Sequence, residues 1–131
     1  MRREAVFVLL DRFAEGGLVH RVDLLTNGVL LSHEDCEELA RKTLLRRIQV
    51  SLEGATDSCH DAIRGEGSFQ ETLEATARMK RHGLTIAVMM TLSRRNMTDV
   101  FALLDLLRER DLDVFTIDRF IPEGQAANHQ G

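Results

Sequence analysis

Cysteine is scarce in this 131-residue chain, which contains only Cys36 and Cys59. Two cysteines cannot build a disulfide framework, and reduced thiols are typical of an intracellular compartment. No apolar run approaches the roughly 18 residues that a membrane-spanning helix needs, and the N-terminus lacks the small-residue cleavage site of a secretory signal. We therefore expect a cytoplasmic protein that does not interact with a membrane.

Concentrated positive charge and metal-ligand spacings are also lacking. The net charge is −4, and the basic residues are spread over several predicted elements, which argues against nucleic acid as a partner. The five histidines have no HxxxH or paired spacing, and we interpret them as solvated side chains: His20, His33, His60, His82 and His129. We expect no metal site built from this chain alone.

The length and the 44% hydrophobic content favour one folding unit with a shared core. The chain has no internal repeat, no low-complexity tract and no linker rich in Pro, Gly or Ser. We expect a single domain over residues 1–125. Residues 126–131 form a tail with too little apolar content to fold, and we expect it to be disordered.

Segments in which apolar residues recur with a helical spacing alternate along the chain with segments whose apolar pattern is typical of strands. Steps of three and four residues predict helices over 4–15, from Ser32 onward, from Ser68 to before Gly83, and over 97–110. Three helix starts carry capping signals, namely Ser32 with Asp35, Ser68 with Glu71, and Asn96. Alternating or continuous apolar runs predict strands over 18–25, 48–52, 84–92 and 113–120.

Helices and strands in this order predict an α/β fold of four parallel strands, which is an arc of a TIM-like βα barrel. Four strands cannot close a barrel, so its inner face and both edge strands should remain open. A polar loop carrying Glu53, His60, Asp61 and Arg64 follows the strand 48–52. It leaves the strand at the carboxyl end, where parallel sheets and barrels bind their ligands.

Five segments resemble a known family in order and spacing. They are LLTNGVLL, RIQVSLEG, HDAIRGEGSFQETLEA, TLSRRN and RFIPEG, and together they resemble the radical S-adenosylmethionine (radical SAM) enzymes. The resemblance covers about residues 21–125, and it is closest to peptide-modifying members with a C-terminal auxiliary iron-sulfur (SPASM-type) domain. It implies that this chain corresponds to the third to sixth strands of a six-stranded partial barrel.

The resemblance implies an enzyme that uses S-adenosylmethionine and a [4Fe-4S] cluster for radical modification of a substrate, for which a peptide is the candidate. This sequence departs from the family pattern because it has neither the CxxxCxxC cluster loop nor the GGEP-like turn that binds the methionyl amino group. Glu53 also replaces the aspartate of the usual SLDG motif. We therefore expect the chain alone to be inactive.

The resemblance also suggests site residues. Ser51 and Arg64 resemble the residues that bind the cofactor's carboxylate or ribose, and Ile121 resembles the position that flanks the adenine. Thr91 is a further cofactor-binding candidate. Each has a structural alternative: a strand-end serine, a loop-stabilising arginine, a strand-end hydrophobe and a β-branched strand residue, respectively.

Two candidates follow the first strand. Thr26 and Asn27 face the barrel mouth and are predicted to meet substrate, although Asn27 is also typical of a tight turn. No catalytic residue is assigned. An acid–base role for Glu53, His60 and Asp61 is disfavoured because no nucleophile accompanies them.

Two other functions remain as alternatives. One alternative is a non-catalytic half-barrel that self-associates or pairs with a partner subunit through its open edges. An aldolase-like lyase is disfavoured because the lysines, Lys42 and Lys80, are both predicted on helices rather than at strand ends.

Overall fold

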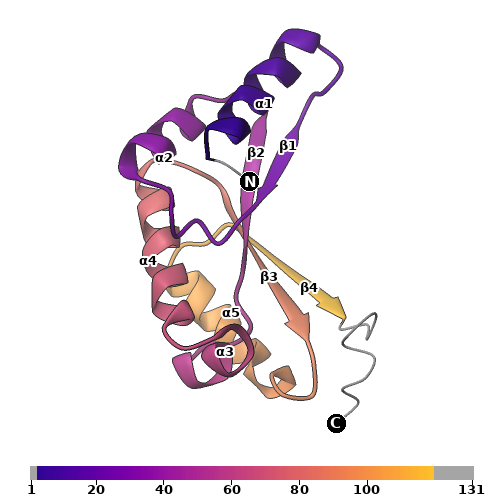
Figure 1. Cartoon of the computed structure of the whole chain (residues 1–131). Coiled ribbons are helices and arrows are strands. Elements are labelled where there is room, and N and C mark those ends of the chain that lie inside the picture. The colour runs from indigo at the N-terminus through magenta and orange to yellow at the C-terminus, as the bar shows by residue number, and fades with distance from the viewer. Residues whose placement is uncertain (1–2, 120–131) are drawn as a thin grey trace.

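The computed structural model describes residues 3–119, in which helices alternate with four strands (Figure 1). The elements are α1 (Arg3–Gly16), β1 (Val22–Leu25), α2 (His33–Ala40), β2 (Leu45–Ser51), α3 (Asp57–Arg64), α4 (Ser68–Arg81), β3 (Ile86–Leu92), the short 3-10 helix η1 (Met97–Asp99), α5 (Val100–Glu109) and β4 (Val114–Arg119). Ile121 and the predicted tail 126–131 lie outside the described residues. No helix within residues 3–119 has the length and apolar content needed to cross a membrane.

The four strands form one parallel sheet in the order β1-β2-β3-β4. The register places Ser51 of β2 beside Met89 of β3, and Met89 beside Thr116 of β4. The helices gather on one side of this sheet, and the other side is left without a covering layer of helices (Figure 1). The predicted architecture of four parallel strands alternating with helices is confirmed.

The core lies between the sheet and the helices because one side chain in two points toward them along each central strand. On β2 and directly after it, Ile48, Val50 and Leu52 are at most 1% exposed. Their partners are likewise fully buried: Ile86, Val88 and Met90 of β3, Leu39 of α2, Met79 of α4 and Leu103 of α5. Each such aliphatic side chain contributes about 1.5–3 kcal/mol by burial, so this interface stabilises the sheet. The intervening Gln49 and Ser51 point to the open face and are only half-buried.

Helix α3 corrects the predicted polar loop after β2. Thr56 is its N-cap and accepts a hydrogen bond at its side chain from the backbone N–H of Cys59 (3.3 Å). Gly54 lets this helix approach the strand end, because a Cβ there would lie 2.5 Å from Cys59 Sγ. The apolar residues of this eight-residue helix are Cys59, Ala62 and Ile63, and its one buried residue is His60.

The structure confirms the predicted helix cap at α2 and contradicts the one predicted at α4. At α2 the capping box is confirmed, because Ser32 Oγ accepts from Asp35 N–H (3.1 Å) and Asp35 Oδ2 accepts from Ser32 N–H (2.8 Å). At α4 it is wrong: the N-cap is Gly67, and Ser68 Oγ donates to Asp61 Oδ1 (3.1 Å). Asp61 of α3 caps α4 instead.

Two predicted elements are shorter or divided in the structure. The predicted strand 18–25 begins only at Val22, and Leu18 is 89% exposed. The predicted helix 97–110 divides into η1 and α5. Asn96 precedes η1 but makes no side-chain cap, which corrects its predicted role.

Candidate functional site

A hollow of about 420 Å³ opens at the carboxyl ends of β1 and β2. We call it the rim hollow. Its walls come from β1–β3, the loop after β1, helix α3 and the first turns of α4. The polar side chains that matter for its chemistry are those of Thr26, Asn27, Ser51, His60, Arg64 and Glu71.

Four of the six predicted site residues line this one hollow: Thr26, Asn27, Ser51 and Arg64. Because the strands are parallel, their carboxyl ends lie at the same edge, which brings residues from distant segments together. Thr91 is not among the lining residues; its backbone N–H donates to Glu53 Oε2 (2.8 Å). Ile121 lies outside the described residues. The hollow therefore brings four of these six positions together, and the ligands that they bind remain a prediction.

The loop after β1 is shaped by its own side chains. Thr26 Oγ1 accepts from Gly28 N–H (3.1 Å), and Asn27 Oδ1 accepts from Val29 N–H (3.3 Å). Gly28 has φ of +69°, which favours glycine. Asn27 therefore has the turn role that its sequence alternative described, and it also lines the hollow.

Helix α4 holds this loop in place. Arg78 Nη2 donates to the carbonyl oxygens of Gly28 and Val29, each at 3.1 Å. A Cβ on Gly28 would lie 2.8 Å from Met79 Cε, so the loop packs directly against the helix. The position of the loop at the rim is thus set by α4 rather than by the loop alone.

Glu53 is the central structural residue of the site, and it is 1% exposed. Its Oε1 accepts from Arg64 Nε (3.0 Å) and Nη2 (2.5 Å), and its Oε2 accepts from the backbone of Thr91. Its backbone N–H donates to His60 Nδ1 (3.0 Å), and its carbonyl accepts from Asn96 Nδ2 (3.0 Å). One residue therefore ties β2 to β3 and to α3.

Arg64 keeps part of its guanidinium available to the hollow. Its side chain is 43% exposed although it pairs with Glu53. The pair uses two of the five N–H groups that an arginine offers. Among the described residues Arg64 has no other partner, so a bound anion could accept from the remaining N–H groups.

His60 corrects the prediction that the histidines are solvated, because it is 1% exposed. Burial lowers its pKa below the ordinary 6.5; the charges of Asp61 and Glu53 act in the opposite direction, and that of Arg64 acts in the same one. The acid–base reading of Glu53, His60 and Asp61 gains no support, since each already has a structural partner.

Asp61 serves the start of α4. Burial favours its protonated form, yet hydrogen bonds from Phe69 N–H, Gly67 N–H and Ser68 Oγ hold its pKa below the ordinary 3.8. An ionised carboxylate at a helix N-terminus also meets the positive end of the helix dipole. Asp61 thus couples α3 to α4.

Asn96 is a buried cross-link that sequence reasoning assigned to a helix cap. Its side chain is fully buried; Oδ1 accepts from Ser93 N–H (2.8 Å), and Nδ2 donates to the carbonyls of Glu53 (3.0 Å) and Thr91 (3.1 Å). It holds the ends of β2 and β3 together beside the hollow. The TLSRRN segment marks this position in the sequence and contains two of its partners, Thr91 and Ser93, whereas the third, Glu53, is 43 residues away.

The cysteines do not fit an iron-sulfur cluster. Cys36 is fully buried on α2, and burial raises its pKa; Cys59 is half-buried on α3, and burial likewise raises its pKa. Both environments favour the protonated thiol, whereas a cluster needs several thiolates at one place. Within residues 3–119 no group of three His, Cys, Asp or Glu side chains is placed to hold a metal.

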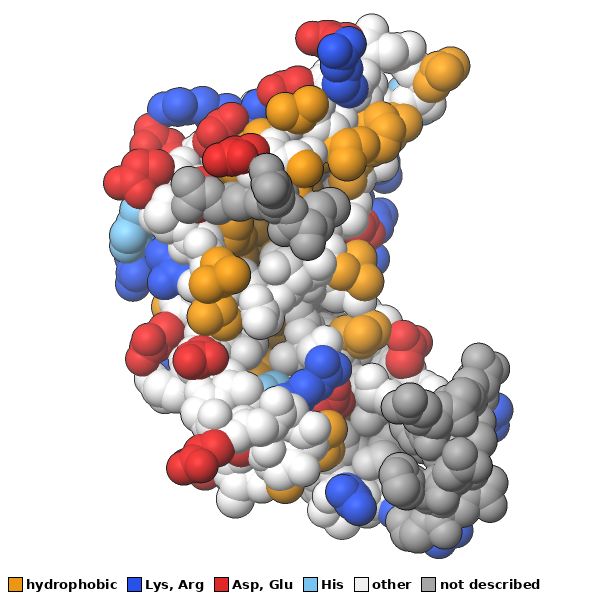
Figure 2. Space-filling view, viewed as in Figure 1, with side chains coloured by type: hydrophobic (Ala, Val, Ile, Leu, Met, Phe, Trp, Pro, Cys, Tyr) orange, Lys and Arg blue, Asp and Glu red, His pale blue; other side chains and the backbone are white. Residues whose placement is uncertain are grey.

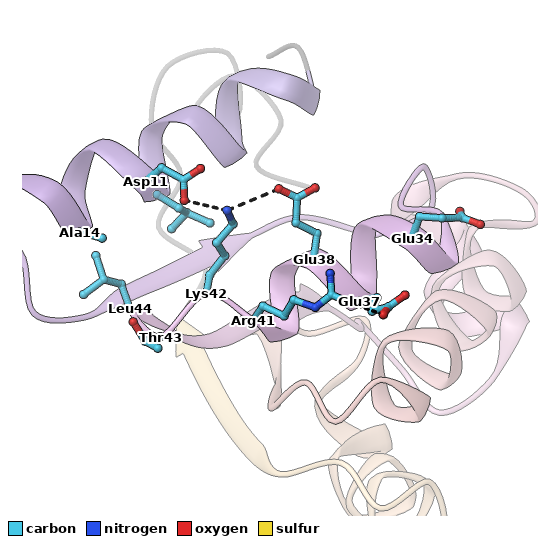
Figure 3. A pocket seen from close by; sticks show the side chains of 10 residues that line it. Asp11, Ala14, Glu34, Glu37, Glu38, Arg41, Lys42, Thr43 and Leu44 are labelled. Carbon is cyan, nitrogen blue, oxygen red and sulfur yellow. Dashed lines mark hydrogen bonds and ion pairs between the residues drawn. The ribbon is translucent and has the colours of Figure 1, made fainter.

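A second hollow of about 600 Å³ lies between α1 and the end of α2, away from the rim (Figure 3). Five of its six charged side chains are paired with one another, the exception being Glu34: Lys42 Nζ contacts Asp11 (2.7 Å) and Glu38 (3.4 Å), and Arg41 pairs with Glu37. The ion pair with Asp11 raises the pKa of Lys42, which opposes Schiff-base chemistry. This second hollow is larger than the rim hollow, but we assign no ligand-binding or catalytic role to its side chains.

Comparison with known proteins gives one consistent family. The model described as "Radical SAM superfamily" matches residues 2–117. The AdoMet-dependent heme synthase of Methanosarcina barkeri is 30% identical over 126 residues, covering 95% of this chain and 35% of that protein. The mycofactocin maturase MftC of Mycobacterium tuberculosis is 36% identical over 110 residues, covering 82% of this chain and 27% of that protein.

Among solved structures, SuiB of Streptococcus suis superposes with a TM-score of 0.75 at 15% identity, covering 92% of this chain and 27% of SuiB. This likeness confirms the predicted partial TIM-like βα barrel. SuiB has been solved bound to S-adenosylmethionine and bound to the precursor peptide SuiA. The chain spans between about a quarter and a third of the length of these three proteins.

Proposed function

The chain belongs to the radical SAM superfamily, and from this premise we propose that its rim hollow forms part of an S-adenosylmethionine site. The observation that carries the proposal is the convergence of Thr26, Asn27, Ser51 and Arg64 on one hollow at the carboxyl edge of a parallel sheet. The SuiB structure with bound S-adenosylmethionine, which has the same fold, supports it.

The side chains of the hollow suit the polar groups of this cofactor. S-adenosylmethionine presents a carboxylate, an ammonium, a ribose diol and an adenine. The Arg64 guanidinium suits the carboxylate, because its planar set of donors matches two carboxylate oxygens. Ser51 offers a hydroxyl to the carboxylate or the ribose. We keep Thr91 and Ile121 as further cofactor-binding residues and Thr26 with Asn27 as substrate contacts.

Glu53 would act as a positioning residue in this site. It holds Arg64 through two hydrogen bonds from the guanidinium and is itself fixed by the backbone of Thr91. A charged acceptor that locks the arginine lowers the entropy lost when a ligand binds. The longer glutamate in place of the family's aspartate therefore preserves the charge at this position.

The reaction of the family is reductive cleavage of S-adenosylmethionine, for which an iron-sulfur cluster supplies the electron. The residues of this chain do not fit that cluster, so we derive no step through it. We propose that the 131 residues alone bind the cofactor but do not cleave it. Anaerobic reconstitution with iron and sulfide, followed by assay for 5′-deoxyadenosine, tests this; robust turnover would contradict it.

We propose a peptide as the substrate class of the enzyme to which this fold segment corresponds. The names of the relatives point in two directions, toward peptide maturation for MftC and toward heme for the M. barkeri protein. The SuiB complex with a precursor peptide and the SPASM-type resemblance favour the peptide.

Cofactor binding can be measured without any cluster. Calorimetric titration of S-adenosylmethionine into the chain should give a measurable Kd, and Arg64→Ala should weaken it about tenfold, as expected for loss of a charged hydrogen-bond pair. Ser51→Ala should weaken it less. Arg12→Ala, an exposed arginine of α1, is the matched control. Equal affinities for Arg64→Ala and the control would refute the assignment.

A second candidate function is supported by exposed apolar side chains at the sheet edges. They are Leu18, Leu25 and Leu30 around β1, at 89%, 65% and 86% exposed, and Ile117 on β4 at 45%. Figure 2 shows hydrophobic side chains gathered toward β1 and its connection from α1. Such edges would let the half-barrel self-associate or pair with a partner subunit. Concentration-dependent sedimentation would detect self-association, and a monomer at all concentrations would exclude it.

A further inference from the structure

His60 lines the rim hollow, and only one of its two ring nitrogens is hydrogen-bonded within the part of the chain that the structure describes. Its Nδ1 accepts from the backbone N–H of Glu53 at 3.0 Å. Because a backbone amide can only donate, Nδ1 carries no hydrogen, and the hydrogen of the neutral ring lies on Nε2. The contact with Glu53 therefore fixes both the tautomer and the ring position.

The Nε2–H group has no protein acceptor. Among the described residues no hydrogen bond from His60 Nε2 exists, although the side chain is 1% exposed. The one fully buried side-chain nitrogen without a partner in residues 3–119 is Nε of Arg78. Nε2 of His60 is not among such fully buried atoms, and His60 is one of the residues that line the rim hollow.

The ring is held in a fixed orientation. Besides the bond to Glu53, it packs against Phe69 of α4, with ring centroids 5.8 Å apart and planes tilted by 52°. Burial lowers the pKa of His60, so the imidazole is neutral at pH 7. The hollow thus contains a pre-oriented, uncharged donor whose acceptor is absent from the described protein.

We propose that His60 is a ligand-contacting residue of the rim hollow, whose Nε2–H donates to a carboxylate oxygen of the bound molecule. This rests on the proposed S-adenosylmethionine site. The carboxylate is favoured because Arg64 and Ser51 are also donors in the same hollow, and a carboxylate accepts about four hydrogen bonds. His60 would be the third donor, and it acts without adding charge.

Two substitutions separate the two nitrogens of the ring. His60→Asn places a carbonyl oxygen near the Nδ1 position, so it preserves the acceptor for Glu53 N–H and removes the Nε2–H donor. His60→Gln places an amide N–H near the Nε2 position and loses the short-range acceptor. A structural role alone would make His60→Gln the more harmful variant for binding; the proposal predicts the reverse.

The test is a calorimetric titration of the chain and both variants with S-adenosylmethionine and with its decarboxylated analogue. We expect His60→Asn to weaken the Kd for S-adenosylmethionine about tenfold, His60→Gln to stay within about threefold, and neither to matter for the analogue. Thermal unfolding of each variant verifies that it folds. Equal weakening of both ligands by His60→Asn would overturn the carboxylate contact.

A measurement on the unaltered chain avoids dependence on the variants. Nitrogen-15 spectra of the imidazole should show the Nε2–H tautomer before titration and a shift of the Nε2 signal when S-adenosylmethionine is added. Binding that leaves this signal unmoved would overturn the inference but not the cofactor site. Absence of binding by the wild-type chain would overturn both.

Discussion

Removal of the Glu53 carboxylate should destabilise the chain strongly, because this side chain joins three elements. In Glu53→Ala the backbone N–H of Thr91 loses its acceptor, which costs about 1–3 kcal/mol. The lost packing of the one deleted methylene group, Cγ, adds about 0.8 kcal/mol.

The pair with Arg64 contributes less. The Arg64 side chain is 43% exposed and can turn to water, so losing the pair costs about 0.5–1 kcal/mol. Glu53→Ala also removes the desolvation cost of burying a carboxylate, and this gain offsets part of the total loss in the free energy of unfolding. We expect a net loss of about 2–3 kcal/mol in the free energy of unfolding.

Urea unfolding followed by circular dichroism measures this loss. Glu66→Ala deletes the same group at an exposed position and should change the free energy of unfolding by less than about 0.5 kcal/mol. Glu53→Gln retains the volume and one acceptor oxygen, so it should lie between the two. A loss for Glu53→Ala no larger than that of Glu66→Ala would refute the cross-linking role of Glu53.

Three further predictions concern the same region. Gly28→Ala should cost about 1–2 kcal/mol in thermal or urea unfolding, because alanine is strained at φ of +69° and its Cβ would press on Met79; a neutral effect would contradict the packing of the loop on α4. Asn96→Ala should cost about 2–4 kcal/mol, since it leaves buried groups at the ends of β2 and β3 without partners; a loss below about 0.5 kcal/mol would contradict its burial. For His60 the lowered pKa means that the unfolded chain binds more protons just below pH 6.5, so the free energy of unfolding should fall as pH drops through that value and level off below the folded-state pKa. Urea titrations at several pH values check this, and His60→Asn should flatten that part of the profile.

The regular parts of the fold were predictable because their signals are local. Apolar periodicity located the four strands, and the Ser32–Asp35 pair marked a helix start that the structure confirms. Strand ends were overestimated where apolar residues such as Leu18 stay exposed, since hydrophobicity alone does not reveal what covers a side chain.

The location of the site was predictable from the sequence, but its hydrogen-bond network was not. Parallel strands imply a common carboxyl edge, so the presence of Ser51 and Arg64 in one hollow was expected from the topology. Helix α3 was missed because it is short and polar, and its N-cap Thr56 was the available signal.

The contacts of Glu53 with Arg64 and Thr91 join residues 11 and 38 positions apart, which no local pattern encodes. The burial of His60 also depends on Phe69 of the next helix. Tertiary contacts of this kind decide which polar side chains remain free for a ligand.

Chemical-shift mapping of the isotope-labelled chain with S-adenosylmethionine tests the cofactor site most directly. We predict saturable shifts that cluster at Thr26, Asn27, Ser51, His60 and Arg64. Shifts confined to the groove between α1 and α2 around Lys42, or no saturable shift at all, would contradict the assignment of the rim hollow.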